Sequence, residues 1–378
     1  MDFRWTPSQA EIYESALRFA RKQLAGPVPP PHQFDRASWK ACGEFGILGL
    51  CVDPQHGGMG LDSLTTAHVL EAVGRGAEEM GLVFAASAHL FACTVPVAEH
   101  GSAELRDRFL PKLARGELIA GNAATEAQAG SDIFAMKATA VRDGDDYVLQ
   151  GEKSYVTNGP VADVFLAYAA TDPGSGYFGL SAFLVERDRP GIVVGAPFDK
   201  IGLGGALTST VYFDDCRVPV QNRLAEEGQG ALIFDHSMAW ERSCLFAAYL
   251  GLMERQLERT IDYVKQRKQF KRRLSQNQGV AFRIADMKLR LEAARLLLYR
   301  ACWMRDQGER ANLDVSLAKL AVSEAVVQSG LDAIQLHGGN GVMEEYGVER
   351  MLRDAIPCRI FSGTSEMQRS IIAQELGL

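Results

Sequence analysis

The period of the hydrophobic pattern changes twice along this chain. Up to about residue 118 apolar side chains recur every three to four residues, as in residues 6–25, which is the spacing of helices packed on a core. Between residues 138 and 213 short or alternating apolar runs are separated by turn signals such as Asp143-Gly144-Asp145, which is typical of β-strands. The order of elements is therefore predicted to be helical, then strand, then helical. The last helices are expected at 231–266, 280–306, 314–337 and 366–376.

The chain has 378 residues, which is too long for a single compact core. The changes of period divide it into an N-terminal helical domain over residues 1–118, a middle β-barrel-like domain over 119–226 and a C-terminal domain over 227–378. The long helices of the last part suit a four-helix bundle. We therefore expect an α+β protein of three domains.

Charge and composition exclude several classes of partner. The net charge of -7 and the pI of about 5.6 argue against a nucleic-acid partner, which requires a basic face. No apolar run is expected to span a membrane, and the N-terminus lacks the pattern of a secretory signal. Seven scattered cysteines and dispersed histidines predict free thiols and no metal site. The protein is expected to be cytoplasmic.

One acidic residue lies inside an otherwise apolar helical segment. Residues 231–266 contain no proline and read as a single long helix, and the run from Cys244 to Met253 is apolar at almost every position. Glu241 and Arg242 lie at the start of this run. A buried carboxylate is costly unless it is paired or has a task, and burial raises its pKa toward the range of a general base. On this segment alone, an ion pair with Arg242 is the simpler interpretation.

Five polar or glycine-containing segments follow one another in a fixed order. Each alone could be a polar turn or a helix C-cap, but the ordered set resembles the acyl-CoA dehydrogenase family of flavoproteins over essentially the whole chain. The segments are Asn122–Asp132 (NAATEAQAGSD), Lys153–Gly159 (KSYVTNG), Arg267–Phe270 (RKQF) with Gln278 eight residues past the phenylalanine, Gln335–Gly341 (QLHGGNG) and Phe361–Arg369 (FSGTSEMQR).

The resemblance implies FAD as cofactor, held between the middle domain and the bundle and completed by a neighbouring subunit of a homotetramer or dimer. Tyr155 stands where many members have tryptophan, and Thr157 matches a position near flavin N5. Arg267 is a suitable partner for the pyrophosphate, since a planar cation pairs with phosphate oxygens. The cofactor-binding positions carried over are Asn122, Ala124, Thr125, Gly130, Ser131, Tyr155, Val156, Thr157, Arg267, Gln269, Phe270, Gln278, Gln335, Gly339, Thr364 and Glu366.

One departure from the family pattern bears on the catalytic base. The commonest members carry a catalytic glutamate in a Glu-Gly-Thr triplet, and here that triplet is Ser362-Gly363-Thr364. A serine hydroxyl does not act as the base at neutral pH. An isovaleryl- and long-chain-type branch carries the glutamate in the long bundle helix before an arginine, and Glu241-Arg242 matches that position. The resemblance therefore makes Glu241 the expected base, with Ser131, Arg242 and Ser362 at the substrate.

The chemistry implied is FAD-dependent α,β-dehydrogenation of an acyl thioester. Residues 240–250 and 360–365 look especially like the branch that acts on carrier-protein thioesters in secondary metabolism, for which prolyl to pyrrolyl is the first guess. Two alternatives stay open: an acyl-CoA dehydrogenase of short or branched-chain catabolism, and a non-catalytic flavoprotein scaffold. The electron acceptor is unknown, and oxygen is not excluded. The basic run Lys271-Arg272-Arg273 either steers an acidic carrier protein or is a solvated helix end.

Overall fold

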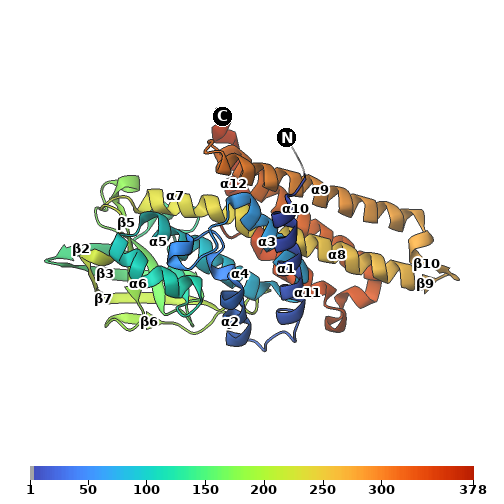
Figure 1. Cartoon of the computed structure of the whole chain (residues 1–378), viewed down its shortest axis with the longest axis horizontal. Helices are drawn as coiled ribbons and strands as arrows, with labels where there is room; N and C mark the ends of the chain where they lie inside the picture. The colour runs from blue at the N-terminus through green and yellow to red at the C-terminus, as the bar shows by residue number, and fades with distance from the viewer. Residues whose placement is uncertain (1–3) are drawn as a thin grey trace.

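The computed structural model describes residues 4–378, so the first three residues of the expected N-terminal domain lie outside the described part. The molecule is elongated, and most of its strands gather at one end (Figure 1). Two long C-terminal helices extend to the opposite end, where a small hairpin joins them, and the N-terminal helices pack between these two parts (Figure 1). The predicted order of helical, strand and helical segments is confirmed.

The N-terminal part is helical and packs closely on the C-terminal part. Thr6 begins the first helix with a capping box to Gln9, and the side chain of Asp62 caps α3. Glycines allow α3 and α8 to approach at backbone distance, since a Cβ at Gly74 would lie 2.0 Å from the carbonyl oxygen of Ala248. The helices are α1 (Pro7–Gln23), α2 (Arg36–Phe45), α3 (Ser63–Gly76), α4 (Met80–His89), α5 (Val95–His100) and α6 (Ala103–Ala114).

The middle part is one sheet in the order β6-β7-β3-β2-β4-β5-β8, with β1 paired in parallel to β4. The strands expected between residues 138 and 213 are present, but the sequence missed β1 and β8, which lie outside that span and are short. The strands are β1 (Ala120–Ala123), β2 (Thr139–Asp143), β3 (Asp146–Thr157), β4 (Val164–Ala170), β5 (Leu180–Glu186), β6 (Ile192–Val194), β7 (Thr208–Pro219) and β8 (Arg223–Leu224).

The C-terminal part is helical, and α10 packs against α8, α9 and α12. The single helix expected over 231–266 is instead interrupted by a π turn at Glu241–Leu245. The sequence also missed α11 and the hairpin β9–β10, which are short and polar. The elements are α7 (Gly230–Trp240), α8 (Ala247–Gln266), β9 (Lys268–Gln269), β10 (Arg272–Arg273), α9 (Gln278–Asp306), α10 (Asn312–His337), α11 (Val348–Ala355) and α12 (Ser365–Glu375).

One segment corrects the expectation that no apolar run is long enough to span a membrane. Met80–His100 forms a nearly continuous helix from α4, a π turn at Leu90–Thr94 and α5, with a mean hydropathy of 1.7 over its most apolar stretch. That stretch is 94% buried inside the protein. It is therefore a core helix, and one apolar core joins it to the N-terminal and C-terminal helices.

Candidate active site

Glu241 is the first residue of the π turn between α7 and α8. Its side chain is buried, with 7% of the residue exposed, and its Oε2 accepts a hydrogen bond from the Ser362 hydroxyl over 2.6 Å. Burial raises the pKa of this carboxyl to about 7, although the Ser362 hydrogen bond and the Arg242 charge act in the opposite direction. A carboxyl with such a pKa can exchange a proton at neutral pH.

Arg242 contacts the terminal segment instead of pairing directly with its neighbour. Its Nε donates to the Ser362 carbonyl over 2.9 Å, and burial lowers the pKa of the guanidinium. No ion pair joins Glu241 to Arg242 in the part of the chain that the structure describes. The ion-pair interpretation of Glu241 is therefore not supported, and Arg242 acts on the carboxylate only through its charge.

Side chains form hydrogen bonds with backbone carbonyls where the π turn interrupts the helix. The Ser243 hydroxyl donates to the Ala239 carbonyl over 2.7 Å, and Arg305 Nη1 donates to the same carbonyl over 3.1 Å and to Ser243 Oγ over 2.6 Å. The Arg305 guanidinium also lies 4.2 Å from the centre of the Trp240 ring. These contacts hold the local backbone that presents Glu241.

A second π turn lies against the first. In the Leu90–Thr94 turn the Val95 N–H donates to the Leu90 carbonyl, and Pro96 follows one residue later. Proline has no N–H to donate, so the wider turn accommodates it without breaking the helix. The rings of Phe91 and Trp240 stack across the two turns with centres 6.1 Å apart. Sequence periodicity does not report π turns, so neither was predicted.

Aromatic rings surround the segment that carries Ser362. The ring of Phe361 lies 4.5 Å from that of Phe84 and 5.4 Å from that of Phe246. Tyr249 contacts the same ring at 6.0 Å. These side chains come from α4, α8 and the linker before it, and they form an apolar cluster beside the residue whose hydroxyl donates to Glu241.

The Asn122–Asp132 loop is held by a buried ion pair that the sequence did not reveal. Lys153 Nζ lies 2.9 Å from Glu126 Oε1, with both side chains almost fully buried. Lys153 also donates to the Ala124 carbonyl over 3.1 Å, and the Ser154 N–H donates to the Thr125 carbonyl over 2.8 Å. The two predicted segments, 122–132 and 153–159, are thus brought together. A glutamate and a lysine in otherwise small, polar motifs were the signal that could have identified this pair.

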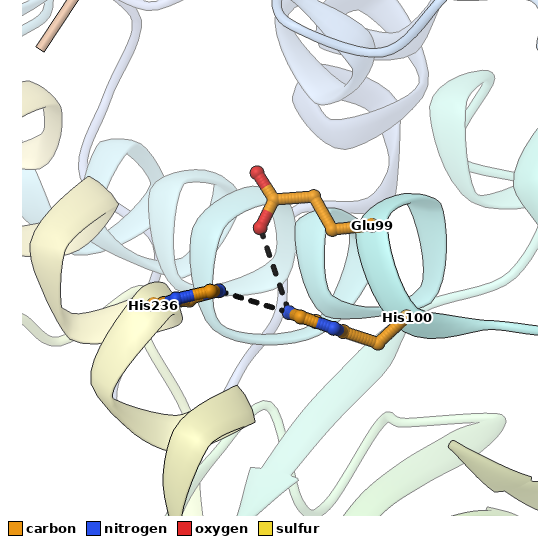
Figure 2. A group of neighbouring side chains, drawn as sticks. All are labelled: Glu99, His100 and His236. Carbon is orange, nitrogen blue, oxygen red and sulfur yellow. Dashed lines mark hydrogen bonds and ion pairs between the residues drawn. The ribbon is translucent and has the colours of Figure 1, made fainter. Parts of the chain in front are cut away.

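Glu99, His100 and His236 meet at the surface between α5 and α7 (Figure 2). Their ligand atoms lie within 4.8 Å of one another, and His100 Nε2 lies 3.2 Å from His236 Nδ1 although 136 residues separate them in sequence. Trp240 Nε1 donates to Glu99 over 2.8 Å. Because these groups bond to one another, their proximity does not require an ion. The expected absence of a metal stays a prediction.

Family models match almost the whole chain. They are described as the acyl-CoA dehydrogenase N-terminal domain over residues 6–117, the middle domain over 121–216 and the C-terminal domain over 228–377. The chain belongs to the acyl-CoA dehydrogenase family. The resemblance seen in the sequence is thereby confirmed.

Individual relatives are similar along their full length. The L-prolyl-[peptidyl-carrier protein] dehydrogenase of Pseudomonas fluorescens Pf-5 is 49% identical, and the match covers 100% of both chains. The solved structure of PigA with FAD and proline has a TM-score of 0.97 at 45% identity, again over 100% of both chains. The prolyl acyl carrier protein oxidase AnaB has a TM-score of 0.97 at 44% identity, covering 99% of this chain and 100% of its own.

FAD is the cofactor that membership of the acyl-CoA dehydrogenase family implies, and the residues present fit it. Asn122 has a buried side-chain oxygen without a hydrogen-bond partner among the described residues. Tyr155 has a left-handed φ of 58° and is 65% exposed, which leaves its aromatic ring accessible to a planar ring system. A Cβ at Gly130 would meet no atom within 4 Å. The two segments together therefore offer one unpaired polar atom, an accessible aromatic ring and free space.

The structure divides the expected cofactor residues into two groups. Those of the 122–132 and 155–157 segments lie in β1, β3 and the loop that follows β1, and Thr364 and Glu366 lie shortly after Ser362. Arg267, Gln269 and Phe270 lie on the hairpin beyond α8, a helix of 20 residues and hence about 30 Å long. Gln335 and Gly339 lie near that same end, where Tyr263 donates to the His337 carbonyl. One chain does not bring the two groups together, so their joint role stays a prediction for an oligomer.

Proposed function

We propose that this protein is an FAD-dependent dehydrogenase that introduces a double bond between the α and β carbons of an acyl thioester. The substrate we propose is a prolyl group carried on a peptidyl carrier protein and oxidised stepwise to pyrrolyl in secondary metabolism. The observation that carries the proposal is the buried Glu241 carboxyl with a pKa of about 7. The relatives named for prolyl carrier proteins support the choice of substrate.

Glu241 acts as the general base in this proposal. The thioester carbonyl acidifies the α C–H, and the Glu241 carboxylate removes that proton. No backbone hydrogen bond to the Ser362 N–H is present among residues 4–378, so this group is free to donate to the thioester oxygen and stabilise the negative charge that develops there. Bound FAD supplies the acceptor for the hydride that leaves the β carbon.

The surroundings of Glu241 suit proton abstraction from a weak carbon acid. Phe84, Phe246 and Phe361 limit access of water, which keeps the pKa of the carboxyl high enough for a useful base. The charge of Arg242 limits how far that pKa rises. Ser131 and Arg242 complete the proposed substrate contacts, together with Ser362.

The partners belong to the proposal as well. We infer a peptidyl or acyl carrier protein as the bearer of the thioester, a homotetramer or dimer as the assembly, and a cytoplasmic location. The three-domain division at 1–118, 119–226 and 227–378 is part of the same proposal. Because AnaB is called an oxidase, oxygen is included among the electron acceptors to be tested.

The position of the basic hairpin limits how it could attract an acidic carrier protein. Lys271, Arg272 and Arg273 are exposed on a hairpin about 30 Å from Glu241 of the same chain. A patch at this position can attract a carrier protein only toward the site of a neighbouring subunit. Reversing the three charges should raise KM for the carrier-bound substrate without changing flavin reduction by a small prolyl thioester.

The experiment that tests the function is anaerobic flavin reduction by three substrates: prolyl-carrier protein, prolyl-coenzyme A and isovaleryl-CoA. We expect rapid bleaching with prolyl-carrier protein, slower bleaching with prolyl-coenzyme A and none with isovaleryl-CoA. Glu241→Gln should retain FAD and lose turnover by about four orders of magnitude or more, whereas the control Glu324→Gln should remain active. Reduction by isovaleryl-CoA alone would move the protein to branched-chain catabolism, and a flavin that no thioester reduces would make it a scaffold.

A further inference from the structure

The hydroxyl of Ser362 is directed at the carboxylate that we propose as the base. Ser362 Oγ lies 2.6 Å from Glu241 Oε2, although 121 residues separate the two in sequence. A hydroxyl that donates to a carboxylate stabilises the ionised form. We propose that Ser362 is a positioning residue, whose hydroxyl orients the Glu241 carboxylate and favours its ionised form over the protonated one. This inference rests on the function proposed above. It adds a role for the Ser362 side chain, whereas the proposed contact of Ser362 with the thioester oxygen involves only its backbone N–H.

Two side chains fix the backbone of Ser362. Its carbonyl accepts from Arg242 Nε over 2.9 Å and from Gln368 Nε2 over 3.4 Å, and Gln368 also donates to the Gly363 carbonyl over 3.2 Å. Ser362 adopts a left-handed φ of 54°, which is unfavourable for a residue with a Cβ. The chain therefore maintains a strained residue at the position from which a hydroxyl can reach Glu241.

The other groups that face Glu241 do not replace this hydrogen bond. Cys93 comes from the Leu90–Thr94 turn and Tyr168 from β4, and burial raises the pKa of the Cys93 thiol and that of the Tyr168 phenol well above their usual ranges. Both are therefore neutral at pH 7. Arg242 is charged, but its Nε is directed at the Ser362 carbonyl. Among the described residues, the Ser362 hydroxyl is the one hydrogen-bond donor recorded for the Glu241 carboxylate.

Removing the hydroxyl should raise the pH at which the base becomes active. A hydrogen bond to a charged group corresponds to a shift of about one to two pH units. We expect the acidic limb of kcat for a prolyl thioester to move upward by that amount in Ser362→Ala. Turnover at pH 7 should fall roughly tenfold and recover as the pH is raised toward about 9.

A pair of variants separates the hydroxyl from the strained backbone. Ser362→Ala and Ser362→Gly both lack the hydroxyl, but glycine adopts a positive φ without strain. The same shift of the acidic limb in both variants is expected if the hydroxyl is responsible. Ser38→Ala is the matched control, since Ser38 also donates to a carboxylate, Asp35, over 2.6 Å but at the start of α2, outside the site, and its limb should not move.

A second readout does not depend on turnover. Infrared difference spectra of the FAD-bound protein over a pH series follow the carbonyl band of the protonated Glu241 carboxyl, with Glu241→Gln identifying the band. The pH at which half of this band is lost should rise by about one to two pH units in both Ser362 variants. An unchanged midpoint and acidic limb, or a shift in Ser362→Ala alone, would overturn the role of the hydroxyl. Failure of the wild-type protein to oxidise any thioester would instead overturn the proposed function.

Discussion

A buried carboxylate lowers the free energy of unfolding of a protein, and Glu241 is such a group. The unfolded chain ionises this carboxyl from about pH 4.5, whereas in the folded protein its pKa is raised to about 7. Between those values the unfolded state loses its proton first, so the free energy of unfolding falls as the pH rises. The full loss is present above about pH 7.

Glu241→Gln should therefore be more stable than the wild-type protein at pH 8. The expected gain is up to about 3 kcal/mol in the free energy of unfolding, from the pKa difference of that carboxyl between the two states, and it should disappear near pH 4. Denaturant unfolding at the two pH values measures it. Equal or lower stability of the variant at pH 8 would show that the carboxylate is better compensated than its surroundings indicate.

Individual residues differed in how far the sequence revealed them. Glu241 could be singled out because a carboxylate in an apolar run is unusual and because the serine triplet left no base elsewhere. The Ser362 hydroxyl contact and the Glu126–Lys153 ion pair could not be predicted, because each joins segments whose spatial relation depends on the tertiary fold. Sequence identifies residues that are out of place in their segment, but not the partners that they meet.

Among the elements, the two π turns position the site. They lie against each other, one before Pro96 and the other beginning at Glu241. A π turn inserts one extra residue into a helix, which changes the direction in which the neighbouring side chains point. Helices were predictable because apolar residues recur at helical spacing over many residues. A single inserted residue leaves that apolar pattern intact on each side, so the sequence does not indicate it.

Arg305→Leu should disturb the π turn at Glu241–Leu245. The variant loses the donors to the Ala239 carbonyl and to the Ser243 hydroxyl, which should cost about 1–3 kcal/mol of stability. Glu241 would then be held less firmly, so we expect a lower kcat with FAD content unchanged. Arg115→Leu, which removes an exposed ion pair with Glu117 far from the turn, serves as control. A kcat equal to that of the wild-type protein would show that the turn does not need Arg305.

At the scale of the whole molecule, two buried histidines connect distant parts of the chain, and both imidazoles are neutral. His89 Nε2 lies 3.0 Å from the Leu113 carbonyl, and its Nδ1 accepts from the Ala120 N–H over 3.0 Å. His68 stacks between Trp5 and Tyr13. Burial lowers the pKa of each imidazole from 6.5 to about 4.

The protein should consequently lose stability as the pH falls from about 6.5 to about 4. The unfolded chain takes up protons on both histidines in that range while the folded protein does not, so each contributes a loss of about 3 kcal/mol. His89→Gln, whose amide can donate and accept without titrating, should flatten the decline in unfolding free energy. An unaltered slope in His89→Gln would contradict the assignment.

The overall architecture was the most predictable level, because the two changes of period mark helical and strand regions over long stretches. The expectation of an α+β fold in the acyl-CoA dehydrogenase family is confirmed. The domain bounds and the site residues remain predictions. The position of the hairpin could not be foreseen, since its place relative to Glu241 depends on the length and direction of α8.

The buried helix Met80–His100 has a consequence for synthesis of the protein. Its covering elements include α7, the Glu241–Leu245 turn and α11, which leave the ribosome only after the sheet has been made. For much of translation the nascent chain thus displays an apolar segment of 21 residues that chaperones or the secretion machinery could bind. Shortened genes that end before residue 247 should yield insoluble product, and low growth temperature or chaperone co-expression should improve the yield of the complete chain.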